Sequence, residues 1–271
     1  MSSSYVDPVR KAGNQAEVPS IRFRQDYICF DGYQQYCLSS SRIRMHKADH
    51  RKKYGLIRPY LLGFGDPRLS LIDLGCSAGV MGFQAYLDGF RDIAFVDHDA
   101  EYLELVNAGL KHIDATAPKT IQSKVEGLSH NADVLFAFAL IHWLYSATEQ
   151  FGSLDRIIAK LSEHGKQTLF IEWVGPECPD IKGFGHLDMN ASVQQEAYTK
   201  EKFVAALEKH YKKVVFVGDV RIGRELWMAT NGDSNPSAAL RFVESVRFLL
   251  WRARSKAGRM LARIGVYRPA A

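Results

Sequence analysis

The chain has 271 residues, of which 46% are hydrophobic and 24% are charged, and its formal net charge is +5. This length is enough for one large α/β domain with additions and a full hydrophobic core. The sequence contains no run of 18 uncharged apolar residues, and residues 1–20 lack an apolar segment, so we expect neither a membrane span nor a secretory signal.

The cysteines are Cys29, Cys37, Cys76 and Cys178. Their spacing contains no C-x-x-C pair, so we expect neither a disulfide framework nor a zinc site. A reducing cytoplasm is therefore the expected location.

Positive charge is concentrated in one segment. Residues 241–271 contain eight basic residues against the single acid Glu244, a net charge of +7. The basic residues are Arg241, Arg247, Arg252, Arg254, Lys256, Arg259, Arg263 and Arg268. The first 240 residues therefore carry about −2, so the body of the protein is not basic.

Two segments precede the first predicted core strand. Residues 1–20 are polar and predict a loose arm. Residues 21–66 carry aromatic and basic residues in quick succession, including Tyr36 and Arg42. This pattern is typical of an amphipathic extension that packs on a core and leaves its charges in solvent.

From residue 68 onward, apolar runs alternate with segments of helical periodicity, which predicts a parallel sheet with crossover helices. The expected strands are residues 69–74, 92–97, a weaker one near 121–126, 134–141, 168–174, and a closing hairpin of 214–217 with 226–229. The expected helices are 79–88, about 101–110, a helix with Leu154, Ile157, Ile158 and Leu161 that ends at Gly165, and 200 to about 210 after the cap Thr199.

The segment from Leu71 to Gly79 is the most informative feature of the chain. A buried strand, a tight glycine turn, a helix and a second buried strand ending in Asp97 have the layout of a half-Rossmann nucleotide site. Glycines stand at 75, 79 and 82, and Ser77 replaces the second glycine of the dinucleotide motif G-x-G-x-x-G. No lysine follows the turn, which excludes a P-loop. The turn predicts a site for an adenosine-containing ligand.

At this point the chain resembles the class I S-adenosylmethionine-dependent methyltransferases, whose first motif has the form acid-x-G-x-G/S/A-x-G. Asp73, Gly75, Ser77 and Gly79 match that motif. In this family the position of Asp97, 22 residues after Gly75, binds the ribose hydroxyls, which a carboxylate does by accepting two hydrogen bonds. The resemblance implies S-adenosylmethionine as cofactor and S-adenosylhomocysteine as product. An ordinary Rossmann-like turn without this cofactor is the alternative.

The resemblance covers residues 68–230 and implies the fold. We expect a Rossmann-like, doubly wound α/β fold whose seven-stranded, mostly parallel sheet closes with an antiparallel hairpin. The expected organisation is an N-terminal arm and active-site cap over residues 1–66, a methyltransferase core over 67–232 and a C-terminal helix over 233–271. In this family an extension such as residues 21–66 usually caps the active site and can supply a basic group for the cofactor's carboxylate. Further cofactor-binding candidates are Cys76, His98, Glu126 and Ala139.

Active sites of open α/β sheets lie beyond the carboxyl ends of the strands. His142 follows the fourth strand and is a candidate general base for an acceptor hydroxyl, since the unperturbed pKa of histidine is about 6.5. The alternative is that His142 only caps or orients its loop. Glu172, in the fifth strand, is a candidate base or acceptor of substrate hydrogen bonds, or a structural carboxylate. The substrate-binding candidates are Tyr36, Arg42, Trp143, Tyr145 and Trp173.

A loop of some 24 residues follows Trp173 and reaches Tyr198. A loop this long is unusual unless it binds something. Its ionisable residues are Glu177, Asp180, His186 and Asp188, of which His186 is the third catalytic candidate. Bacterial RNA 3′-end 2′-O-methyltransferases use a glutamate and histidine cluster in this region. Their closely spaced glutamate and histidine pairs are missing here, so we expect no metal.

Residues 237–271 predict a basic amphipathic helix that starts after Asn235 and Pro236. Its apolar face comprises Phe242, Val246, Leu249, Leu250, Ala253, Ala257, Met260, Leu261 and Ile264. Arginines flank this face, which is typical of a helix in an anionic membrane interface, although Trp251 falls on the polar side. The alternatives are a partner protein or packing of the same face onto the body. The large aliphatic side chains favour lipid or protein over nucleic acid.

These observations predict an S-adenosylmethionine-dependent O-methyltransferase that acts on a sugar or sugar phosphate of a bacterial surface or lipid-linked glycan. Bacterial methyltransferases that cap polysaccharide chains offer an analogy in architecture. We expect a cytoplasmic protein, peripheral at the inner face of the membrane through residues 237–271. The alternatives are an RNA or small-metabolite methyltransferase, and a non-catalytic module that keeps the fold. The acceptor atom and the oligomeric state are not specified by the sequence.

Overall fold

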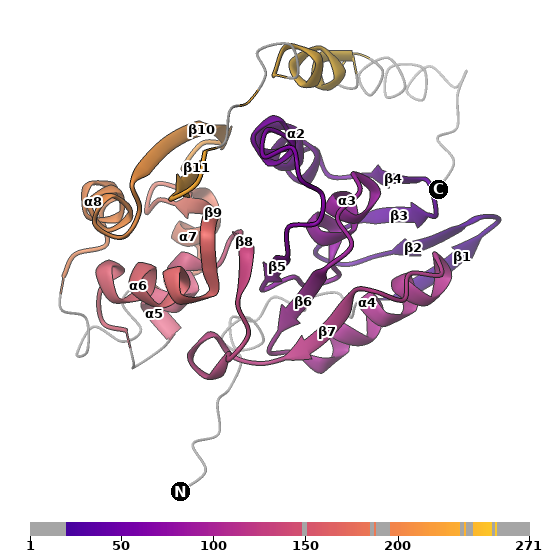
Figure 1. The fold of residues 1–271 in the computed structure, drawn as a ribbon, viewed down its shortest axis with the longest axis horizontal. Helices are drawn as coiled ribbons and strands as arrows, with labels where there is room; N and C mark the ends of the chain where they lie inside the picture. Colours follow the sequence, from indigo (N-terminus) through magenta and orange to yellow (C-terminus); the bar gives the residue numbers. More distant parts are fainter. Residues whose placement is uncertain are drawn as a thin grey trace, which may run out of the picture.

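The computed structural model describes residues 20–147, 151–184, 187, 196–233, 236, 241–250 and 253 (Figure 1). The predicted N-terminal arm lies outside the described residues except for Ser20. A central sheet is flanked by helices on both faces, and a smaller sheet built from the N-terminal extension lies beside it.

The central sheet has seven strands in the order β10-β11-β9-β8-β5-β6-β7. Their bounds are β5 Leu71–Leu74, β6 Ile93–Asp97, β7 Lys119–Gln122, β8 Ala132–Ala137, β9 Gly165–Val174, β10 Lys213–Arg221 and β11 Arg224–Thr230. Strands β5 to β9 pair in parallel, whereas β11 pairs antiparallel with both β9 and β10. The predicted doubly wound fold, its mostly parallel sheet and its closing hairpin are confirmed.

The described helices are α2 Ala48–Leu62, α3 Val80–Leu87, α4 Ala100–His112, α5 Ile141–Ala147, α6 Leu154–His164, α7 Pro179–Phe184 and α8 Lys200–His210. Helices α2, α3 and α4 share one apolar core with the N-terminal sheet, and α5, α6 and α8 form a second core on the opposite face of the central sheet. The predicted cap Thr199 is present, since its hydroxyl accepts a hydrogen bond from the backbone N–H of Lys202 at 3.4 Å.

Two predicted strands differ from the structure in their bounds. The strand expected near 121–126 lies at Lys119–Gln122, and a 3₁₀ turn over Val125–Gly127 follows it. The apolar run expected to extend to Ile141 leaves the sheet after Ala137, and Ala139 adopts a left-handed φ of 52°. Apolar character alone therefore did not locate the end of the strand, because Ile141 is equally buried as the first residue of α5.

The N-terminal extension forms a four-stranded antiparallel sheet in the order β1-β2-β3-β4. Its strands are β1 Ile21–Arg24, β2 Tyr27–Phe30, β3 Tyr36–Ser39 and β4 Arg42–Met45. Sequence reasoning identified this segment as a packed extension but did not find the strands. Helix α2 continues from this sheet and packs against β10 and β11 at the far edge of the central sheet.

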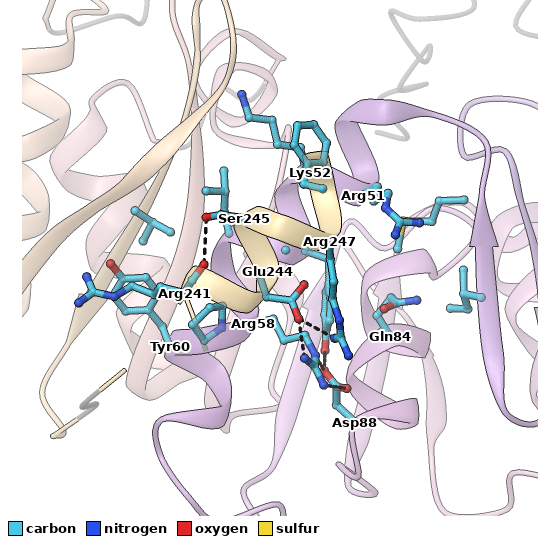
Figure 2. Close-up of a pocket in the computed structure, with 18 of the residues that line it drawn as sticks. Arg51, Lys52, Arg58, Tyr60, Gln84, Asp88, Arg241, Glu244, Ser245 and Arg247 are labelled. Carbon is cyan, nitrogen blue, oxygen red and sulfur yellow. Dashed lines mark hydrogen bonds and ion pairs between the residues drawn. The ribbon is translucent and has the colours of Figure 1, made fainter. Parts of the chain in front are cut away.

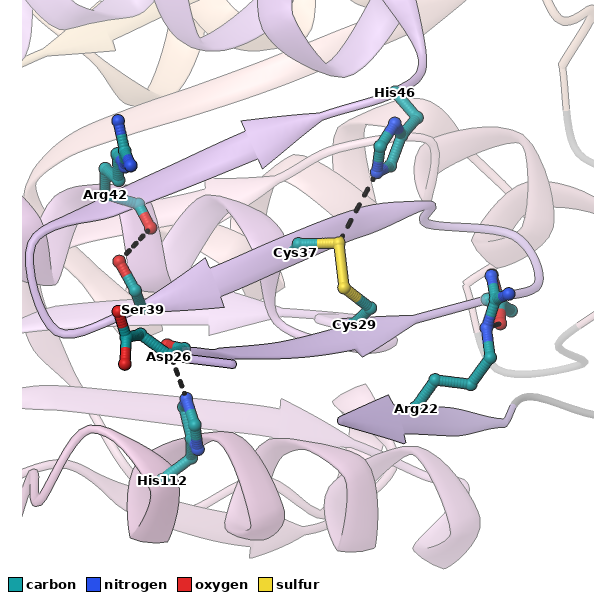
Figure 3. Close-up of a disulfide and its surroundings, with 9 residues drawn as sticks. Arg22, Asp26, Cys29, Cys37, Ser39, Arg42, His46 and His112 are labelled. Carbon is teal, nitrogen blue, oxygen red and sulfur yellow. Dashed lines mark hydrogen bonds and ion pairs between the residues drawn. A yellow bond between two sulfur atoms is a disulfide. The ribbon is translucent and has the colours of Figure 1, made fainter. Parts of the chain in front are cut away.

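A disulfide joins Cys29 and Cys37 across β2 and β3 (Figure 3). The two residues are directly opposed in the antiparallel register, with their Cα atoms 4.0 Å apart. The expectation of no disulfide framework was therefore wrong, and the cysteines no longer support the reducing location that was inferred from them. The pairing depends on the strand register, which the cysteine spacing did not reveal. Cys76 and Cys178 are buried free thiols.

Residues 241–250 are helical, as the periodicity predicted, and lie beside α2 (Figure 1). Glu244 Oε1 accepts a hydrogen bond from Arg58 Nη1 of α2 at 2.7 Å. Within the described part of the chain, none of the helices combines the length and apolar character needed to cross a bilayer.

Candidate functional site

The glycine turn after β5 depends on left-handed backbone at three positions. Gly75, Ser77 and Gly79 have φ values of 66°, 50° and 82°. A side chain at Gly79 would also be crowded, because a Cβ there would lie 3.0 Å from side-chain atoms of both Phe95 and Val106. The chain therefore turns sharply from the buried strand into α3, which places the backbone of the turn at the carboxyl edge of the sheet.

Asp73 supports the turn from within the core. Its Oδ2 accepts a hydrogen bond from the backbone N–H of Gly82 at 2.8 Å. Burial raises the pKa of the Asp73 carboxyl to about 7; the Gly82 hydrogen bond opposes this rise and the charge of Asp97 adds to it. A side chain at Gly82 is excluded, since its Cβ would lie 2.3 Å from Phe95 Cε1. Asp73 and Gly82 thus fix α3 against the strand.

Asp97 connects the end of β6 to the glycine turn. Its Oδ2 accepts a hydrogen bond from the Ser77 N–H at 2.8 Å, and its Oδ1 accepts one from the Asp99 N–H at 3.0 Å. A carboxylate has about four acceptor positions, so these two backbone bonds leave capacity to accept from a ribose hydroxyl. The Ser77 hydroxyl is buried and has no hydrogen-bond partner among the described residues. A buried polar atom of this kind fits a site that receives a polar ligand.

The other cofactor candidates lie along the same edge. His98 directly follows β6, with Nδ1 3.2 Å from Asp97 Oδ1. Glu126 lies in the 3₁₀ turn after β7, and Ala139 lies after β8. Because β5, β6, β7 and β8 are parallel neighbours, their carboxyl ends bring these positions to one side of the sheet. The Cys76 thiol is buried, and burial raises its pKa, so this side chain is a core group rather than a ligand contact.

Two residues of the N-terminal extension hold the glycine turn: Gln34, in the turn between β2 and β3, and Tyr36, the first residue of β3. Gln34 Nε2 donates to the Cys76 carbonyl at 3.0 Å, and Gln34 Oε1 accepts from the Val80 N–H at 3.1 Å. The hydroxyl of Tyr36 donates to the Ala78 carbonyl. Tyr36 is completely buried, so the structure places this predicted substrate residue beneath the cofactor turn. Sequence reasoning missed Gln34, because nothing local to it indicates a partner more than 40 residues away.

His142 lies at the start of α5, next to the carboxyl end of β8. The side chain is buried, and the His142 carbonyl accepts a hydrogen bond from Ser146 Oγ at 2.8 Å. Trp143 is half-buried, with its ring centroid 5.3 Å from the imidazole. Of the residues predicted to contact the methyl-acceptor substrate, His142 and Trp143 therefore lie near the carboxyl edge of the sheet.

Tyr145 and Trp173 instead contribute to the core beneath α6 and α8. Trp173 is 1% exposed, and its ring stacks on Tyr198 at 4.4 Å and on Phe203 at 5.0 Å. Tyr145 is equally buried and donates from its hydroxyl to the Glu196 carbonyl. These two predicted substrate residues have no surface available to an acceptor.

Glu172 lies on the opposite face of β9, between two cations. Its Oε2 accepts from Lys53 Nζ at 2.6 Å and its Oε1 accepts from Arg224 Nη1 at 3.1 Å, and all three side chains are buried. Arg224 also donates to Asp180 Oδ2 at 2.7 Å. Burial lowers the pKa of Arg224, but the charge and hydrogen bond of Glu172, together with Tyr33 and Cys178, outweigh burial and raise it overall. Both carboxylate oxygens of Glu172 are therefore bound by cations. This arrangement supports the alternative that Glu172 is a structural carboxylate.

Two predicted site residues are not placed at this edge. Arg42 lies on β4, where its Nε donates to the Tyr27 hydroxyl, and it lines a groove beside α2. His186 lies outside the described residues, as does Asp188. Among the residues that the structure describes, no group of three or more His, Cys, Asp or Glu side chains is arranged to hold a metal ion.

No family model matches the chain, and no curated protein matches its sequence. Solved structures match it by fold. The monomeric WbdD structure gives a TM-score of 0.51 at 15% identity and covers 69% of this chain and 42% of that chain. A second WbdD structure, described as a bifunctional kinase-methyltransferase, gives 0.50 at 15% identity, with 68% and 39% covered.

The magnesium protoporphyrin IX methyltransferase ChlM from Synechocystis PCC 6803 with bound S-adenosylhomocysteine gives a TM-score of 0.51 at 11% identity, and the match covers 68% of this chain and 84% of ChlM. This chain spans about two fifths of the length of WbdD. The glycine turn, the acid Asp97 at the end of β6 and the strand order agree with the fold of these structures. The chain thus has the seven-stranded fold of the class I S-adenosylmethionine-dependent methyltransferases.

Proposed function

We propose that the protein is an S-adenosylmethionine-dependent methyltransferase that O-methylates a sugar or sugar phosphate of a bacterial surface or lipid-linked glycan. The observation that carries the cofactor assignment is the pair Asp97 and Ser77. Asp97 has acceptor capacity beyond its bond to the Ser77 N–H, and the Ser77 hydroxyl is buried without a partner among the described residues. Both groups lie at the carboxyl edge, where nucleotide ligands bind in open α/β sheets.

Asp97 would bind the ribose hydroxyls, and the turn from Gly75 to Gly79 would lie against the amino acid part of the cofactor. His98, Glu126 and Ala139 would line the remaining edge. Gln34 and Tyr36 would not contact the ligand but would hold the turn in its left-handed conformation. S-adenosylmethionine, when bound, supplies an activated methyl group.

The protein has to align the acceptor with this methyl group and exclude water. We assign His142 as the base that removes the proton of an acceptor hydroxyl, because it lies in the first turn of α5, which follows the carboxyl end of β8, beside Trp143. A phosphate acceptor needs no base, so His142 would be dispensable if a phosphate oxygen is methylated. Glu172 is assigned a structural role in fixing α2 to β9 through Lys53.

A membrane-borne glycan accords with the charge distribution of the chain. Residues 241–271 carry a net charge of +7 against about −2 for the rest. Basic residues beside an apolar helical face favour an anionic bilayer surface. The protein would therefore act at the inner face of the membrane, where lipid-linked glycans are assembled.

Methyl transfer to three acceptor pools tests the proposal. Purified protein and methyl-labelled S-adenosylmethionine are incubated with lipid-linked glycan, total RNA or a small-metabolite extract from the source cells. We expect label in the glycan fraction. Label in RNA or metabolites alone would overturn the acceptor, and cofactor binding without transfer to any pool would identify a non-catalytic module. Absence of cofactor binding would overturn the whole assignment.

A further inference from the structure

A groove lies between α2, β4, β10 and the helix of residues 241–250 (Figure 2). Its volume is about 1170 Å³, and its lining includes none of the residues of the glycine turn. Basic side chains enter it from both walls, with Arg51 and Lys52 on α2 and Arg241 and Arg247 on the C-terminal helix. The groove is therefore separate from the candidate cofactor site.

The C-terminal helix contacts the body through the face that carries Glu244 and Phe248. Glu244 points toward α2, and its Oε1 lies 2.7 Å from Arg58 Nη1 (Figure 2). Nε of the same arginine lies 2.7 Å from Asp88 Oδ2. Phe248 lies one turn later on the same face, and the centroid of its ring is 6.0 Å from Lys52 Nζ. At 100° per residue, positions 244 and 248 are roughly opposite to 242, 249 and 253. The helix thus docks with the side that carries Glu244.

Docking in this orientation leaves most of the predicted apolar face exposed. Phe242, Leu249 and Leu250 are 71%, 61% and 55% exposed, and Ala253 is also exposed, whereas Val246 is half-buried. Leu249 and Leu250 also line the groove. Most of the apolar face of residues 241–250 is therefore not packed into the core of the body. Large aliphatic and aromatic side chains exposed together on a helix typically mark an interaction surface.

The charge of the groove is unbalanced. Its lining contains six basic residues, Arg42, Arg51, Lys52, Arg58, Arg241 and Arg247, and two acidic ones, Asp88 and Glu244. Arg58 binds both acids, and Arg247 Nη1 lies 2.8 Å from Glu244 Oε1. The acids are thus already engaged by two of the six cations, and the lining keeps a net charge of +4.

The remaining cations include groups whose observed partners are neutral. Lys52 Nζ donates to the Val220 carbonyl at 3.1 Å and lies over the Phe248 ring. Arg42 donates to the Tyr27 hydroxyl. Burial lowers the pKa of Arg51, and the charge of Arg247 lowers it further, whereas the charge of Glu244 raises it. An anion in the groove would favour the charged form of this partly buried guanidinium.

We propose that the groove is a headgroup site for an anionic phospholipid, with the lipid phosphate between α2 and the C-terminal helix and with Phe242, Leu249 and Leu250 inserted into the bilayer interface. The exposed apolar side chains Phe242, Leu249 and Leu250 favour a bilayer as the ligand, because binding of a soluble phosphate would need only the cations. This inference rests on the membrane part of the proposed function and adds residues of the body to the binding surface.

Vesicle co-sedimentation tests this assignment with phosphatidylglycerol–phosphatidylcholine vesicles and with phosphatidylcholine vesicles alone. The groove variant is Arg51→Gln with Lys52→Gln, which keeps donor groups. The matched control is Lys111→Gln with Lys119→Gln, which removes the same charge from exposed positions on α4 and β7. We expect the groove variant to bind anionic vesicles roughly thirtyfold more weakly, at about fivefold for each basic residue near an anionic surface, and the control to change little.

A third variant, Leu249→Ser with Leu250→Ser, removes part of the apolar row and should weaken binding even where charge is retained. If the tail deletion 241–271 abolishes binding but the groove variant does not weaken it, the tail alone binds membrane and the groove assignment is overturned. Equal losses in groove and control variants would show a general charge effect and overturn it too. Full vesicle binding by the Leu249 and Leu250 variant would overturn the bilayer as the occupant.

No vesicle binding by the full chain would overturn both this inference and the membrane location, and would leave the methyltransferase assignment standing. Thermal unfolding of each variant shows whether the fold is retained.

Discussion

Lys53 Nζ lies 2.6 Å from Glu172 Oε2, and the two side chains are 3% and 0% exposed. The pair joins α2 of the N-terminal extension to β9, the strand that pairs with β11 of the antiparallel hairpin. Because the same carboxylate also accepts from Arg224, its removal would leave two buried cations without their shared anion.

Glu172→Gln should therefore reduce the free energy of unfolding by about 3–5 kcal/mol, the usual effect of breaking a buried ion pair. Urea unfolding measures this. Glu163→Gln is the matched control, since the pair of Glu163 with Lys160 lies on the surface and contributes no more than about 1 kcal/mol. Unchanged stability with lost turnover would instead make Glu172 a catalytic carboxylate.

Asp97→Ala should weaken S-adenosylmethionine binding at least about tenfold, because truncating a buried hydrogen-bonding group costs about 1.5–3 kcal/mol. Titration calorimetry compares it with Asp92→Ala, which removes an exposed carboxylate just before the amino end of β6. Equal affinities for all three proteins would remove Asp97 from the site.

His142→Ala should lower turnover by about 10²–10⁴ if the acceptor is a hydroxyl, while cofactor affinity stays near that of the wild type. Steady-state kinetics and calorimetry on the same preparation separate the two effects. Retained turnover together with a lower melting temperature would show that His142 only orients α5, or that a phosphate oxygen accepts the methyl group.

The sequence predicted the strands that are buried on both faces of the sheet. β5, β6 and β8 are almost entirely buried and are apolar apart from one aspartate each, and the spacing from Gly75 to Asp97 located the carboxyl edge. The N-terminal sheet was missed although its strands are as long as β5, because β1 and β4 are largely exposed and polar residues interrupt their apolar ones. Such segments lack the continuous apolar run that marks a buried strand.

The sequence predicted the candidate site correctly only for residues that are close both in sequence and in space. Glu172 and Trp173 were both assigned to the acceptor region, although adjacent residues of a strand point to opposite faces of the sheet. In the structure Glu172 faces α2 and Trp173 packs beneath α8. Because side chains alternate between the two faces of a strand, Glu172 and Trp173 cannot both contact the same acceptor. Lys53 has no such local signal, since it lies 119 residues from its partner.

Asp73 should make stability depend on pH. Burial raises its pKa from 3.8 in the reference state to about 7 in the folded protein, so the folded state binds more protons between these values. The stability contributed by the protonated carboxyl is fully present below the lower value and is lost as the pH rises through the higher one.

Asp73→Asn removes this titration and keeps an acceptor for the Gly82 N–H. The stability of Asp73→Asn relative to the wild type should therefore rise between pH 4 and pH 7, by at most on the order of 4 kcal/mol. Urea unfolding at several pH values measures the difference. A difference that is constant with pH would show that Asp73 titrates normally.

Reduction of the disulfide between Cys29 and Cys37 should weaken the cofactor site as well as the fold. The bond closes a loop with a sequence separation of 8, and this loop contains Gln34 and Tyr36, which hold the glycine turn. A loop of this length predicts a loss of about 2–3 kcal/mol in unfolding free energy. Dithiothreitol should lower both the melting temperature and the affinity for S-adenosylmethionine.

The double variant Cys29→Ser with Cys37→Ser should reproduce both losses and should no longer respond to dithiothreitol. Free thiols at Cys76 and Cys178 remain in this variant, so its insensitivity would assign the effect to the one disulfide. Lower stability with unchanged cofactor affinity would show that the backbone pairing of β2 and β3 holds Gln34 and Tyr36 in place without the covalent bond.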